Sequence, residues 1–118
     1  MRHFTQNEAM FVGYLSNKAG IHLGDLSKIS IFVVDEEYGS LRSSNLTKGD
    51  RVKSKAECQF DDEDGVPVCV ILLLTAAEKF GELVFWKGDG TPILKLPDDE
   101  CSLHSFRKIS PSSQPSSK

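Results

Sequence analysis

The 118-residue sequence predicts an α+β domain in which an N-terminal helix packs on a mostly antiparallel sheet of about five or six strands. Two features indicate this class. A helix-capping pattern opens an amphipathic segment near the N-terminus, and short stretches of β-branched and aromatic residues follow it, separated by turns rich in Asp and Gly. Hydrophobic residues make up 39% of the chain, enough for one core. We therefore expect a single domain over residues 1–109 and a disordered Ser/Pro tail over residues 110–118.

The expected helix covers residues 5–17. Thr5 and Glu8 form a capping box, in which the threonine hydroxyl accepts from an amide of the first turn and the glutamate reaches back to the amide of the cap. Apolar residues then recur at helical spacing and give the helix one apolar stripe: Met10, Phe11, Tyr14 and Leu15. This stripe predicts that the helix packs against the sheet.

The expected strands, in chain order, cover residues 28–34, 40–43, 55–60, 66–74, 82–87 and 93–96. Residues 55–60 alternate between apolar and polar side chains, which is typical of a strand with one face open to water. Residues 66–74 are apolar on both faces apart from Pro67, so we expect this strand to be central. The acidic residues 61–65 between these two strands predict a hairpin turn with a solvated tip.

Charge and hydropathy exclude several classes of protein. Lys and Arg number 14 against 17 Asp and Glu, for a formal net charge of −3, and neither sign is gathered in one half of the ordered region. Without a basic stripe, a nucleic-acid partner is not expected. The longest apolar run, residues 66–74, is shorter than the roughly 20 residues that cross a bilayer. The N-terminus lacks the apolar stretch of a secretory signal, so we expect a cytoplasmic protein with no membrane partner.

The sequence contains no recognisable catalytic or metal-binding constellation. The three cysteines are odd in number and lack C-x-x-C spacing, which argues against disulfides and a zinc site. The three histidines lack the spacing of metal ligands on one helix, and there is no G-x-S-x-G elbow or phosphate loop. We therefore expect a protein that is not an enzyme and has no catalytic residue, metal site or cofactor.

Two polar turns beside aromatic residues are the candidate partner-binding sites: the first contains Asp35, Glu36, Glu37 and Tyr38, and the second contains Lys87 and Asp89. Trp86, the only tryptophan, precedes the second turn. We expect Trp86 to be structural, with its ring in the core and its indole N–H hydrogen-bonded to an acceptor. The alternative is an exposed Trp–Lys–Asp patch, since tryptophan is favoured at binding hot spots.

Several segments in order carry a resemblance to a known family: Arg2 with the T-x-x-E of Thr5 and Glu8, Asp35 before Gly39-Ser40-Leu41, Asp-Gly-x-Pro-Val at residues 64–68, and Trp-Lys-x-Asp at residues 86–89. Over about residues 2–97, the chain resembles a small bacterial family of uncharacterised cytosolic domains, a domain of unknown function. The resemblance implies a required local structure at the tryptophan turn. It implies no particular reaction.

Small, mildly acidic domains of this kind are similar in style to bacterial immunity proteins, which bind and block a cognate toxin. The expected function is therefore a non-catalytic protein-binding module that neutralises a toxin, with the two polar turns against a basic surface of the toxin domain. Two alternatives stay open. The chain could be a small-ligand-binding domain or minor enzyme that uses the turns at Asp35–Glu37 and Asp89, or a structural accessory domain.

Overall fold

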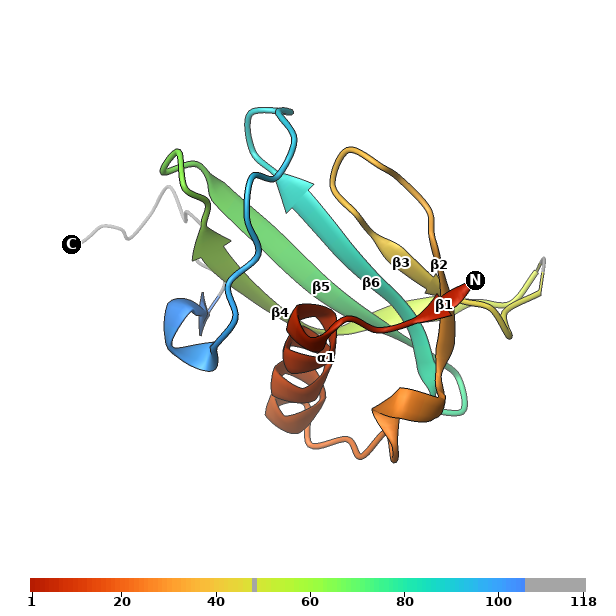
Figure 1. Cartoon of the computed structure of the whole chain (residues 1–118). Coiled ribbons are helices and arrows are strands. Elements are labelled where there is room, and N and C mark those ends of the chain that lie inside the picture. The colour runs from red at the N-terminus through yellow and green to blue at the C-terminus, as the bar shows by residue number, and fades with distance from the viewer. Residues whose placement is uncertain (48, 106–118) are drawn as a thin grey trace, which may run out of the picture.

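The computed structural model describes residues 1–47 and 49–105, so the predicted tail over residues 110–118 lies outside the described residues. The described residues form one α-helix, two short 3-10 helices and seven strands: β1 (Arg2–His3), α1 (Gln6–Lys18), η1 (Leu26–Lys28), β2 (Ser30–Val33), β3 (Leu41–Ser43), β4 (Val52–Asp61), β5 (Pro67–Thr75), β6 (Phe80–Lys87), η2 (Glu100–Ser102) and β7 (His104–Ser105). The predicted α+β class, with an N-terminal helix on an antiparallel sheet, is confirmed (Figure 1).

The strands form one sheet in the order β1-β2-β3-β6-β5-β4-β7, with every neighbouring pair antiparallel. Five strands are longer than two residues, and the two-residue strands β1 and β7 lie at the edges. β5, expected to be central, lies between the long strands β4 and β6. The predicted strand at residues 93–96 is wrong, because the amides of Leu94 and Lys95 bind the carboxylate of Asp62 instead of a neighbouring strand.

The predicted capping box is present and also ties α1 to the first strand. The Thr5 hydroxyl accepts from the Glu8 amide, and the Glu8 carboxylate accepts from the Thr5 amide at 2.9 Å. Arg2 of β1 binds the same carboxylate through two hydrogen bonds of 2.7 and 2.9 Å. Burial by itself raises the pKa of Glu8, but the hydrogen bonds from Arg2 and the Thr5 amide outweigh it and lower the pKa.

The core lies between α1 and one face of the sheet. Phe11 of α1 packs its ring 5.6 Å from that of Phe60 on β4 and 5.3 Å from that of Phe85 on β6. The segment after β6 lies on the same face as α1, because Asn7 of the helix donates to the carbonyls of residues 96 and 97. Figure 1 shows α1 against one face of the sheet only, and side chains on the other face are less buried, as expected for an antiparallel sheet with one face packed on the core.

Gly81 of β6 lies where its neighbours leave no room for a side chain. The register between β5 and β6 shifts between Leu73 and Leu74, opposite this glycine. A Cβ atom on Gly81 would lie 2.6 Å from Cγ1 of Val52 and 2.9 Å from the carbonyl oxygen of Leu73. Both distances are shorter than van der Waals contact, so the position excludes a side chain.

We expect Gly81→Ala to lower the free energy of unfolding by about 1–3 kcal/mol, the usual cost of inserting an extra carbon into packed surroundings. Urea denaturation measures the change. The matched control is Gly13→Ala within α1, where a Cβ meets nothing within 4 Å. Because alanine favours a helix over glycine, the control should be neutral or stabilising by up to about 1 kcal/mol. Equal destabilisation by both substitutions would contradict the packing explanation.

Candidate partner-binding surface

Lys87, predicted to contact a partner, is instead buried at the end of β6. Residues 85 and 87 face α1 along this strand, and the side chain of Lys87 is 0% exposed. Its Nζ lies 2.9 Å from Oδ2 of Asp62 and 2.7 Å from Oδ2 of Asp64, and it donates to the carbonyl of Pro92 at 3.1 Å. The partner-binding assignment of Lys87 is therefore wrong, because its ammonium group is used internally.

Asp62 is the other half of this buried cluster. Its carboxylate accepts a hydrogen bond from the ammonium group of Lys87. It also accepts hydrogen bonds from three backbone amides: Leu94 at 2.7 Å, Lys95 at 3.1 Å and Glu63 at 2.8 Å. Burial by itself raises the pKa of Asp62, but these hydrogen bonds outweigh it and lower the pKa to about 2. The predicted hairpin turn is present. The expectation of a wholly solvated acidic tip fails at Asp62, whose negative charge compensates Lys87.

Trp86 points to the face of the sheet opposite the helix. It lies between two buried residues of β6 and pairs with Cys69 of β5, and its side chain is 54% exposed. The prediction that its ring packs in the core is therefore wrong. The neighbouring pair on this face, Ile71 and Val84, is only half-buried. Trp86 thus extends an apolar strip to the end of the sheet.

The turn between β2 and β3 is held by Asp35. Its carboxylate accepts hydrogen bonds from the amides of Tyr38 at 2.7 Å and Gly39 at 3.1 Å. Asp35 therefore has a structural role in the turn. Glu36 and Glu37 are exposed, and Tyr38 is half-buried against the edge of the core. Of this predicted group, the two glutamates and the tyrosine are therefore positioned to meet a partner.

The turn after β6 lies beside the first one. Asp89 accepts from the hydroxyl and the amide of Thr91 at 2.6 and 3.0 Å, and these hydrogen bonds lower its pKa. A Cβ atom on Gly90 would lie 3.9 Å from the hydroxyl of Tyr38. The fold thus brings together two predicted turns that are about 50 residues apart in the sequence.

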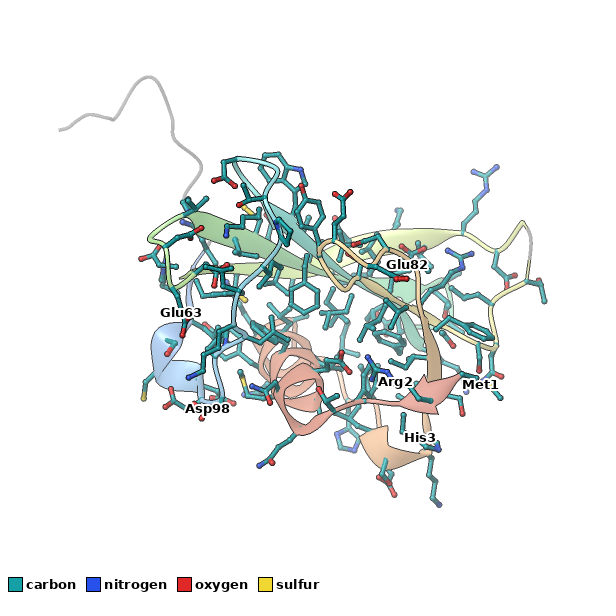
Figure 2. All side chains as sticks on the ribbon, turned by 45° about the horizontal axis from the view of Figure 1, so that its top comes forward. Met1, Arg2, His3, Glu63, Glu82 and Asp98 are labelled. Carbon is teal, nitrogen blue, oxygen red and sulfur yellow. The ribbon has the colours of Figure 1, made fainter. Side chains whose placement is uncertain are left out.

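Three loops with negative charge line one border of the sheet, which we call the acidic edge: the β2–β3 loop, the β4–β5 turn and the turn after β6 (Figure 1). Together with Asp61 at the end of β4, they contain eight of the 17 Asp and Glu residues and no Lys or Arg: Asp35, Glu36, Glu37, Asp61, Asp62, Glu63, Asp64 and Asp89. Figure 2 shows Glu63 and Asp98 on one side of the molecule, away from Met1 and Glu82. The topology thus collects at one border charges that the sequence order scatters.

Other side chains of the described region show little sign of reactivity. Burial raises the pKa of the Cys58 thiol to about 12 and also raises that of Cys69, so both stay protonated at neutral pH. Among residues 1–47 and 49–105, no three His, Cys, Asp or Glu side chains are grouped so as to hold a metal ion. The helices in this part of the chain are too short or too polar to cross a bilayer.

Comparison with known proteins gives one match. A family model described as a domain of unknown function (DUF6984) matches residues 1–97. This agrees with the expected resemblance to an uncharacterised domain family over nearly the same residues. Neither a curated protein nor a solved structure matches the chain.

The Asp62 carboxylate should make stability depend on pH. Its pKa is about 2 in the folded protein and about 3.9 in an unfolded chain. A lowered pKa contributes stability that is fully present above about pH 4 and is lost as the pH falls through 2. At pH 7, Asp62→Asn should lower Tm by about 10 °C or more, because Lys87 loses a buried charged partner. The difference from wild type should narrow between pH 4 and pH 2.

Thermal unfolding followed by circular dichroism from pH 2 to pH 7 measures both effects. Asp61→Asn is the matched control, because this neighbouring residue is exposed. Its Tm should stay close to that of the wild type. A difference for Asp62→Asn that is constant over the whole pH range would show that its charge does not stabilise the fold.

Trp86 should contribute little to folding. We expect its fluorescence in the native protein to resemble that of indole in water, and Trp86→Ala to change the free energy of unfolding by less than about 1 kcal/mol. Phe85→Ala, one position earlier and facing the core, should cost about 3–5 kcal/mol. Fluorescence spectra and denaturant titrations test the pair. A blue-shifted native spectrum, or equal costs for the two substitutions, would contradict this assignment.

Proposed function

The chain belongs to the DUF6984 family of domains of unknown function, and we propose that it is a non-catalytic protein-binding module whose acidic edge and Trp86 engage a basic surface of a partner protein. The observation that carries this proposal is the gathering of three acidic loops beside an exposed tryptophan. Complementary charge accelerates encounter and fixes orientation, while an aromatic anchor supplies much of the affinity.

The charged part of the proposed interface consists of side chains that the fold does not use internally. Glu36, Glu37 and Glu63 are exposed. By contrast, Asp35 holds its own turn, and Asp62 and Asp64 bind Lys87. The internal ion cluster keeps the β4–β5 turn in place, so that the exposed carboxylates are presented from a fixed backbone. This arrangement suits steering of a basic partner by charges at the rim.

The apolar part of the interface is centred on Trp86. Tryptophan buries a large area when it enters a pocket on a partner, and it is enriched at energetic hot spots. The half-buried Tyr38 lies beside the second polar turn and adds a second aromatic side chain to the acidic edge. Trp86 next to exposed carboxylates fits a partner that offers an apolar pocket bordered by Lys or Arg.

Acid–base catalysis by the two turns has less support. A carboxyl group with a raised pKa needs an apolar enclosure. Glu36 and Glu37 are exposed, and Asp35 and Asp89 each accept hydrogen bonds within their own turns. This favours binding over a reaction at these residues.

Within this function, we propose that the partner is a toxin domain and that the protein acts as an immunity protein in the bacterial cytoplasm. The small size of the domain and the acidic edge support this finer assignment, since an inhibitor of a toxin with a basic active surface needs complementary charge. Inhibition would be steric, with the acidic edge covering the active surface of the toxin.

Coexpression with the toxin domain encoded beside its gene tests the toxin assignment. We expect cells to grow only when this protein is present. Growth arrest that the protein does not relieve, or a neighbouring gene that encodes no toxin, would overturn the toxin assignment.

Charge reversal tests the acidic edge itself. In the double variant Glu36→Lys/Glu37→Lys, we expect association with the partner protein to be about tenfold slower at low salt and to depend less on salt concentration, while Tm stays unchanged. Asp98→Lys with Glu100→Lys changes the net charge equally outside the acidic edge and is the matched control. Trp86→Ala should mainly accelerate dissociation of the complex with the partner protein and change the association rate little. Stopped-flow and surface plasmon resonance measurements separate the rates. Equal association rates for the two double variants would exclude the acidic edge as the binding surface.

A further inference from the structure

A group of positive charges lies at the other end of the long strands. The β5–β6 hairpin, the first half of β4 and η1 contribute five exposed cations, which we call the basic end: Lys28, Arg51, Lys53, Lys55 and Lys79. Within the described part of the chain, none of the five forms an ion pair. Lys87 and Arg2, by contrast, bind carboxylates. The cations of the basic end are therefore free to bind an anion.

Two hollows adjoin these cations on either side of the hairpin tip. The smaller, of 550 Å³, is lined by Arg51, just before β4, by Lys53 and Lys55 of β4, and by residues 74–78. The larger, of 880 Å³, is lined by Lys28, Lys79 and Arg51 among other residues. Both volumes lie within the range of small-molecule sites. Arg51 and the hairpin tip belong to both hollows.

We propose that the smaller hollow binds a small anion with two or three linked phosphate groups. Three cations face a single carboxylate there, that of Glu78. Arginine binds phosphate oxygens in a bidentate manner, and lysine adds compact positive charge. The site lies at the opposite end of the sheet from the acidic edge and does not depend on the proposed protein partner.

The backbone of β4 explains why three cations reach one hollow. Alternate residues of a strand are about 6–7 Å apart and lie on one side of it, so the long side chains at positions 51, 53 and 55 can converge on linked phosphate groups, which lie closer together than these backbone positions. The pairing of β4 with β5 is irregular between Ser54 and Ala56, and such a bulge redirects nearby side chains. Lys55 sits within this irregularity and lines the same hollow as Arg51 and Lys53.

Glu78 is the second unusual feature of the hollow. Its φ of 60° is the only positive value for a non-glycine residue among those described, in a hairpin turn where glycine would fit with less strain. Hydrogen bonds from its amide and that of Lys79 to Thr75 hold the turn. Strained residues of this kind cluster at binding sites. We assign to Glu78 a tuning role, because its negative charge in the lining of the hollow repels a bound anion.

The apolar part of the lining favours a phosphate chain over nucleic acid. Leu74, Ala76 and Ala77 provide the apolar surface of the smaller hollow. Proteins that bind single-stranded nucleic acid generally stack bases on aromatic side chains, and none lines this hollow in the described region. The recognised group is therefore the charged chain of phosphates and not a base.

Titration with inorganic pyrophosphate at constant ionic strength, followed by amide resonances in NMR, tests the site. We expect saturable shifts confined to residues 51–55 and 74–79. Because each exposed cation contributes a factor of about two to five, Arg51→Gln with Lys53→Gln should weaken binding about tenfold. Glu78→Gln should tighten binding about two- to fivefold. Lys18→Gln with Lys95→Gln, which removes two exposed lysines outside the hollow, is the matched control and should bind like the wild type.

Three outcomes would overturn the proposal. Changes in amide chemical shift that do not saturate with pyrophosphate, or that sodium chloride reproduces at the same ionic strength, would show general screening of charge instead of binding at a site. Equal affinity of the Arg51/Lys53 and Lys18/Lys95 double variants removes the hollow as the site. Binding of a single-stranded oligonucleotide at residues 51–55 without binding of pyrophosphate indicates a nucleic-acid surface instead of a small-anion site. Tm measurements on every variant establish that the fold is retained.

Discussion

The buried ion cluster of Lys87, Asp62 and Asp64 is the constraint on which the acidic edge depends. The ammonium group of Lys87, at the end of β6, donates hydrogen bonds to Asp62 and Asp64 of the β4–β5 turn and to the carbonyl of Pro92. The carboxylate of Asp62 also accepts hydrogen bonds from the amides of Leu94 and Lys95. One ammonium group and one carboxylate thus join three separate parts of the chain. A buried cation needs such compensation, because removing Lys87 leaves the buried Asp62 carboxylate without its counter-ion, and removing the Asp62 charge leaves Lys87 with only the partly exposed Asp64. The loops around the cluster are fixed for the same reason.

The topology of the sheet turns a nearly balanced charge composition into two distinct ends. Antiparallel strands bring the β2–β3 loop, the β4–β5 turn and the end of β6 to one border, and the β5–β6 hairpin and the start of β4 to the other (Figure 1). Acidic residues occupy the first border, and the five cations of the basic end outnumber the carboxylates beside them, Asp25, Asp50 and Glu78, at the second. A net charge of −3 therefore describes neither surface. Each end can attract a ligand of opposite charge, and their separation allows both to be occupied together.

Local patterns in the sequence predicted the helix, its cap and the long strands, because capping and alternation act between near neighbours. The orientation of β6 was predicted wrongly. One face of this strand carries Leu83, Phe85 and Lys87, and the other carries Glu82, Val84 and Trp86. Each face contains two apolar residues and one charged residue, so the alternation does not show which face is buried. The counter-ion that admits Lys87 to the core comes from a turn about 25 residues away, and no local signal shows it. The proximity of the two polar turns likewise follows from strand order, which one sequence does not reveal.

The two-residue strands β1 and β7 have a consequence for association of the sheet. They cover parts of the outer sides of β2 and β4 and offer few free backbone groups of their own. A long uncovered edge would template pairing with other chains and promote aggregation, which natural sheets avoid with short edge strands. Within the described residues, β7 pairs with only Cys58 and Gln59 of β4, and the exposed Lys53 and Lys55 add charge to the rest of that edge, which opposes pairing with another chain while the sheet exposes an apolar strip at Trp86. Contacts made through the strip are directed to the face of the sheet, where side chains rather than backbone decide which partner is accepted.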